Sequence, residues 1–116
     1  MRYMLMSHID TSGLAALSPD AREAAMERFV SFTRALADSG VLCGAEQLQP
    51  AETATTVRVR DEGALLTDGP YADLPESFGG FWIVRAPDLD TVLAYAADCP
   101  AAAYGSVEIR PLVELD

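Results

Sequence analysis

The sequence predicts an α+β domain in which an antiparallel sheet is covered on one face by two helices. Three observations predict this fold. Short apolar runs alternate with two amphipathic helical segments, a β-hairpin separates two strand–helix–strand units, and half of the 116 residues are apolar, which is enough for one core. This order of elements is that of a ferredoxin-like fold, so we expect a single domain over residues 1–116.

The first unit begins with the apolar run at 2–9, whose length suits a buried strand. A helix is expected to start at Ser18, a good N-cap, with Pro19 in its first turn. Gly40 is expected to end it, and a second strand follows at 41–48. The buried face of this helix has 4-3-4 spacing and comprises Ala25, Phe29, Phe32 and Leu36.

A hairpin is predicted at 55–67, where the strand TTVRVR alternates and Asp61-Glu62-Gly63 makes the reversal. On this strand Val57 and Val59 are expected to point inward.

The second unit consists of a strand at 80–86, a helix and a last strand at 106–113. Asp88 is the expected N-cap of the helix, and Pro100 closes it. Its predicted buried face comprises Leu89, Val92, Leu93 and Ala96.

The face of the sheet that the helices leave free is expected to be apolar. Met4, Met6, Trp82 and Val84 are the side chains that would need cover there. A second copy of the chain is the simplest cover, so the sequence predicts a symmetric homodimer in which two sheets face each other.

The charge is −10, from 18 acidic and 8 basic residues, and every basic residue is an arginine. Such a surface repels phosphate, so neither direct nucleic-acid binding nor attachment to an anionic membrane is expected. No apolar run is long enough to span a bilayer, and no signal-peptide cleavage site follows the apolar N-terminus. The sequence therefore predicts a cytoplasmic protein.

Metal and cofactor sites are not expected. Cys43 and Cys99 are far apart and sit among apolar neighbours, which predicts free, buried thiols rather than a disulfide or a zinc site. With one histidine, His8, the chain cannot build a His-rich metal cluster.

Five residues are candidates for a reaction or binding site. Histidine is the side chain whose unperturbed pKa lies near neutral pH, and His8 lies at a strand end, so it is a candidate catalytic base, with Asp68 or Tyr71 to orient it or hold a substrate. Phe29, Tyr71 and Trp82 are candidate ligand-binding residues. Each candidate also has a purely structural explanation. His8 can have its hydrogen bonds satisfied at the sheet edge, and Asp68 can form an Asx-type turn before Gly-Pro. The aromatic side chains can belong to the core or to the dimer interface.

The stretch TDGPYADLPESFGGF at 67–81 joins turn formers, acids and aromatics. No helix with GxGxxG spacing follows Gly79-Gly80, so a sharp strand entry or a bulge is expected there rather than a phosphate site. The stretch resembles the signature of the YCII-related family, in the group named for its DGPF motif. RYMLM, ATTVRVRD and GSVEIRPL are similar to further family features, and the resemblance covers nearly the whole chain.

The resemblance implies a dimeric α+β barrel, and for function it implies two classes. One is a small-molecule binding protein or a metal-free lyase or isomerase with a pocket between sheet and helices. The alternative is an accessory or regulatory protein that acts through protein contacts. An extracytoplasmic-function sigma factor is the partner that the resemblance suggests. Aligned from Gly40, the histidine proposed for the family's catalytic pair falls at Phe29, and its aspartate lies one residue from Asp98, which favours binding.

Overall fold

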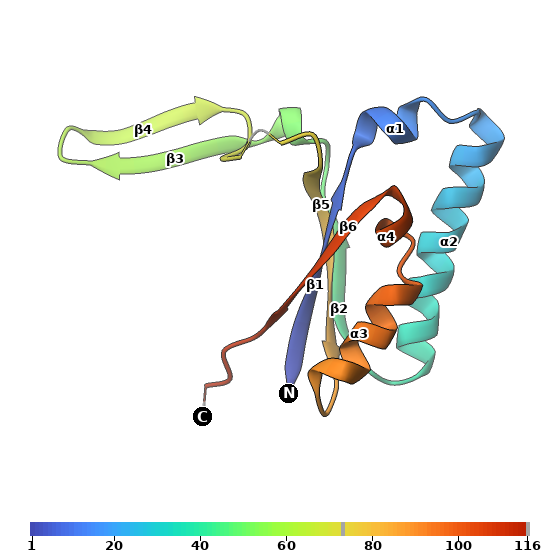
Figure 1. Ribbon diagram of the computed structural model, residues 1–116. Helices are drawn as coiled ribbons and strands as arrows, with labels where there is room; N and C mark the ends of the chain where they lie inside the picture. The colour runs from blue at the N-terminus through green and yellow to red at the C-terminus, as the bar shows by residue number, and fades with distance from the viewer. Residues whose placement is uncertain (73, 116) are drawn as a thin grey trace.

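The structure is a computed structural model that describes residues 1–72 and 74–115, so Asp73 of the TDGPYADLPESFGGF stretch lies outside it. A four-stranded antiparallel sheet in the order β2-β5-β1-β6 forms the body of the protein (Figure 1). Its strands are β1 (Arg2–Ile9), β2 (Leu42–Gln47), β5 (Ser77–Arg85) and β6 (Gly105–Pro111). This is the ferredoxin-like α+β fold that the sequence predicts.

The helices lie on one face of this sheet (Figure 1). They are α1 (Thr11–Ala15), α2 (Pro19–Asp38), α3 (Leu89–Asp98) and α4 (Ala101–Tyr104), and a 3-10 turn, η1, spans Ala51–Thr53. Between sheet and helices lies a core that includes Tyr3, Leu5, Phe32, Leu36, Trp82, Val84, Val92 and Ala96. The sequence did not predict α1 or α4, which are each too short to show a helical period.

Helix α2 follows the prediction closely. The Ser18 hydroxyl accepts a hydrogen bond from the Ala21 backbone N–H at 3.1 Å, and Gly40 has a left-handed φ of 76° beyond the last turn. The helix buries Ala25, Phe32 and Leu36, and Phe29 packs half-buried beside them.

Helix α3 differs from the prediction on one side. Asp88 caps it as expected, but Leu89 and Leu93 are exposed, and only Val92 and Ala96 of the predicted face are buried. A ten-residue helix at the edge of the layer buries a narrower stripe than its sequence offers.

The Asp88 cap predicts a dependence of stability on pH. Hydrogen bonds from the Thr91 hydroxyl and backbone N–H lower the pKa of Asp88. Because the folded pKa is lowered, the carboxylate stabilises the fold above its unfolded pKa of about 4 and loses that effect as the pH falls through the folded value. Asp88→Asn keeps a capping oxygen without the titration, so its thermal midpoint should fall less than wild type between about pH 5 and about pH 2. An identical fall would contradict this.

The predicted hairpin forms, but outside the main sheet. Strands β3 (Thr55–Arg60) and β4 (Gly63–Asp68) make a separate two-stranded sheet, which projects on the side away from the helices (Figure 1). The expectation that Val57 and Val59 point inward is wrong, because they are 58% and 70% exposed. Alternation shows that a strand has two faces but does not show what covers either of them.

The second face of the main sheet is not covered by any helix in the described part of the chain (Figure 1). Met4 and Met6 lie on it, as expected. Trp82 and Val84 do not, which corrects the prediction: they pair with Leu5 and Tyr3 and are buried on the helix side. Strand alternation therefore places their neighbours in β5, Phe81 and Ile83, opposite Met6 and Met4 on the uncovered face.

Both cysteines are free, but only Cys99 is buried. Cys43 is exposed, which corrects the prediction of two buried thiols. It lies at a register shift between Leu42 and Gly44 that turns it out of the pairing of β2 with β5. None of the helices in the described residues is long and apolar enough to cross a membrane.

Candidate functional site

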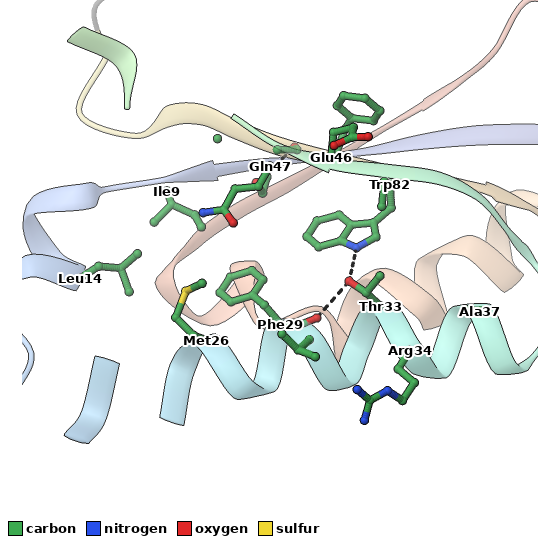
Figure 2. Close-up of a pocket in the computed structure, with 16 residues that line it drawn as sticks. Ile9, Leu14, Met26, Phe29, Thr33, Arg34, Ala37, Glu46, Gln47 and Trp82 are labelled. Atoms are coloured by element: carbon green, nitrogen blue, oxygen red, sulfur yellow. Dashed lines mark hydrogen bonds between the residues drawn. The ribbon is translucent and has the colours of Figure 1, made fainter. Parts of the chain in front are cut away.

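A cavity of about 560 Å³ opens between α2 and the ends of β1, β2 and β5 (Figure 2). A volume of this size is typical of small-molecule sites. Its lining comprises Ser7, Ile9, Leu14, Met26, Phe29, Val30, Thr33, Arg34, Ala37, Ala45, Glu46, Gln47, Gly79, Gly80, Phe81 and Trp82. Phe81 belongs to this lining although strand alternation directs its side chain to the uncovered face.

An aromatic wall forms one side of the cavity. The rings of Phe29 and Trp82 are nearly parallel, at 5°, with centroids 6.3 Å apart, and Phe32 packs edge-on against Trp82 at 5.2 Å. The indole N–H of Trp82 donates to the Thr33 hydroxyl at 2.9 Å, and that hydroxyl donates to the Phe29 carbonyl at 3.0 Å (Figure 2). The indole is therefore held in one orientation from α2.

The sheet side of the cavity includes the two adjacent glycines of β5. Between Ser7 and His8 the pairing of β1 with β5 skips Gly79, so of the two expected features, a sharp strand entry or a bulge, the bulge is present. A Cβ on Gly80 would lie 2.9 Å from the Glu46 carbonyl oxygen and 3.6 Å from the Ser7 hydroxyl. The absence of a side chain at Gly80 thus lets β2 pair closely with β5 beside the buried Ser7, whose hydroxyl donates to the Gly80 carbonyl at 3.2 Å.

The open side of the cavity is mostly apolar. Met26 and Leu14 lie beside Phe29, and the carboxamide of Gln47 points from β2 toward α2, next to Ile9 (Figure 2). The two charged lining residues, Arg34 and Glu46, direct their charged groups away from the space between α2 and the sheet (Figure 2).

A second cleft, of about 500 Å³, lies on the uncovered face and contains His8. The His8 Nε2 atom is 3.1 Å from Glu108 Oε1, and Arg110 donates to Glu108 Oε2 at 2.7 Å. Hydrogen bonds from Arg110 and then from His8 lower the pKa of Glu108. At the edge of the cleft the Ser106 hydroxyl donates to Glu76 at 2.8 Å.

The structure does not bring the five predicted site residues together in one place. Phe29 and Trp82 line the cavity together, whereas His8 lies on the opposite face of the sheet. Asp68 ends β4 opposite Thr55, and no hydrogen bond joins it to His8 among the described residues.

Tyr71 lies outside both clefts as far as the structure describes their linings. It is 78% exposed, and the Arg58 guanidinium lies 5.2 Å from its ring centroid.

Three residues that line the cavity could not be recognised from the sequence as ligand-site residues. Gln47 reads as a polar strand end, Met26 as a helix surface residue and Ile9 as part of a strand. Only the packing of α2 over the ends of β1 and β2 brings them together. Glu108, the partner of His8, was likewise not predicted, since strand pairing of His8 with Ser106 decides which β6 residues lie near it.

Within residues 1–72 and 74–115, no group of three or more His, Cys, Asp or Glu side chains is placed to hold a metal ion. The cavity offers hydroxyl and amide groups and aromatic faces to a ligand, which suit an uncharged organic molecule.

Comparison with known proteins shows the family. Residues 1–116 match the YCII-related domain. An uncharacterized protein of Rhizobium meliloti (strain 1021) is 31% identical over 114 residues, which are 97% of this chain and 92% of that protein.

A structure similar to this one is 5-chloro-2-hydroxyhydroquinone dehydrochlorinase (TftG) from Burkholderia phenoliruptrix AC1100, in complex with 2,5-dihydroxybenzoquinone. The TM-score is 0.58 at 13% identity, over 97% of this chain and 94% of the other, so this likeness supports the fold. With its full length matched by the domain, the chain belongs to the YCII-related family.

Proposed function

We propose that this protein binds a small planar aromatic molecule in the cavity between α2 and the sheet. The observation that carries the proposal is the parallel pair of Phe29 and Trp82 in an apolar cavity of about 560 Å³. Aromatic side chains held in a fixed orientation offer stacking and edge contacts to a planar ring. The similar dehydrochlorinase structure, which contains a dihydroxybenzoquinone, supports the same class of ligand.

Binding is favoured over acid–base catalysis in this cavity. Among the described lining residues, Arg34 and Glu46 are the titratable ones, and both direct their charged groups elsewhere (Figure 2). Phe29 stands where the family resemblance would place a histidine. A metal-free lyase or isomerase reaction needs an acid–base group within hydrogen-bond reach, and that role would fall to His8 in the second cleft, with Glu108 at 3.1 Å as its partner.

A blocking variant tests the proposal. Met26 is 50% exposed beside the aromatic wall, so Met26→Trp should fill the open side without crowding the core. Wild type should be stabilised by about 2.7 kcal/mol at a hundredfold excess of 4-methylphenol or 4-hydroxybenzamide over its Kd, and Met26→Trp should lose most of this. Thermal-shift measurements and calorimetry report both quantities.

Control variants identify the site. Leu93→Trp places the same side chain at a position 48% exposed on α3, outside the cavity, and should bind as wild type does. His8→Ala and Asp68→Asn should also bind normally. Loss of binding in His8→Ala with full binding in Met26→Trp would move the site to the second cleft, and no binding to wild type would reject the proposal.

We also propose that the chain belongs to the DGPF group of the family and that two copies of it form a homodimer. Two features support the homodimer. The uncovered sheet face carries Met4, Met6, Phe81 and Ile83, and the hairpin β3–β4 projects on the same side (Figure 1). Sedimentation equilibrium should give twice the mass of one chain, because this apolar face needs cover. A monomer at micromolar concentration would contradict the proposal.

An accessory or regulatory role through protein contacts is the second candidate, and the hairpin favours it. Leu66 is 72% exposed beside Val57, and an isolated two-stranded sheet is marginally stable in water unless it packs on something. Rapid amide exchange in residues 55–68 of a homodimer would show that the hairpin stays free in it. In that case a protein partner that covers the hairpin would be the better explanation of its exposed residues.

A further inference from the structure

We infer that the cavity selects uncharged ligands that carry a carbonyl or amide group, and that Gln47 is the residue that determines this selectivity. The inference rests on the proposed function, since it names the class of ligand for the same cavity.

Hydrogen-bond capacity in the cavity points to Gln47. The Thr33 hydroxyl donates to the Phe29 carbonyl, and the Ser7 hydroxyl donates to the Gly80 carbonyl, so both protons are already used. Gln47 is exposed at the rim of the cavity, where its carboxamide points from β2 toward α2 and makes no hydrogen bond with other described residues (Figure 2). It offers two N–H donors and one acceptor oxygen, which match a ligand carbonyl or amide beside the aromatic wall.

Charge excludes anionic ligands from the same position. Arg34 lines the cavity, but its guanidinium points away from the sheet and from Gln47 (Figure 2), so no cation among the described lining residues points inward. A carboxylate in the cavity would lose its hydration without gaining an ion pair. The chain charge of −10 adds a repulsive field.

This preference does not come from the similar dehydrochlorinase structure. At 13% identity that likeness says nothing of the groups that select a ligand in this cavity. The selectivity follows from the side chains of this cavity and from the net charge of the chain.

Two ligands of equal shape test the inference at neutral pH by calorimetry. 4-Hydroxybenzamide is uncharged, and 4-hydroxybenzoate carries one negative charge on the same frame. The amide should bind at least about tenfold more tightly. Gln47→Ala should weaken amide binding about five- to tenfold and leave 4-methylphenol, which lacks a carbonyl, unchanged. Arg34→Ala should leave the ratio of the amide affinity to the benzoate affinity unchanged, because the guanidinium points away from Gln47.

The outcomes separate this inference from the proposed function. If none of the three compounds binds, the proposed function fails and the inference with it. If all three compounds bind, but the affinity for the benzoate equals or exceeds the affinity for the amide, only the inferred selectivity is wrong. A loss of benzoate affinity in Arg34→Ala would point to the same conclusion. If Gln47→Ala weakens 4-methylphenol as much as the amide, Gln47 shapes the cavity and does not determine selectivity.

Discussion

Replacing Gly105 with alanine should lower the free energy of unfolding by about 3 kcal/mol or more. Gly105 begins β6 opposite Ile9, where the two strands approach closely. A Cβ there would overlap the His8 carbonyl oxygen and lie 3.0 Å from the Ile9 Cα atom. Because these are backbone atoms, no side-chain rotation relieves the overlap, and β6 must shift away from β1.

Gly44→Ala is the matched control in urea unfolding. Gly44 lies in β2, and a Cβ there would have no neighbour within 4 Å, so its substitution should change stability by less than about 0.5 kcal/mol. Equal denaturation midpoints for the two variants would show that β6 does not approach β1 in this way.

Leu5→Ala should cost about 2–5 kcal/mol, the range for a fully buried leucine. Leu5 is fully buried on the helix side of β1 and pairs with Trp82. Its neighbour Met6 points to the uncovered face, so Met6→Ala should cost clearly less in one chain, and its cost should grow with protein concentration if two copies meet there. Unfolding curves at two protein concentrations measure both effects.

A larger cost for Met6→Ala at every concentration would reverse the assignment of the two faces of β1. In that case the core would lie on the side that Met4 and Met6 share.

The sequence predicts most of the fold because its signals are local. Ser18, Asp88 and Gly40 mark helix ends through hydrogen bonds or a backbone angle that depend on few neighbours. The face of Trp82 could not be predicted in this way. The strand SFGGFWIVR has apolar residues on both faces and a bulge at Gly79, so only pairing with β1 decides which aromatic side chain is buried.

The site was predictable to a smaller extent. Phe29 and Trp82 are large aromatic side chains on predicted elements, and both line the cavity. Gln47 and Met26 become cavity residues only through the position of α2 over the sheet, which no local pattern encodes. His8 was a reasonable candidate by its chemistry, but its contact with Glu108 depends on the register of β6.

A two-dimensional NMR titration of isotope-labelled protein with 4-hydroxybenzamide shows where this ligand binds. The chain has one tryptophan, so a single indole N–H signal reports on the aromatic wall. Ligand binding in the cavity should move this signal together with the backbone amides of Thr33, Gln47 and Gly80. Shifts confined to His8, Ser106 and Glu108, with the indole signal unmoved, would contradict it.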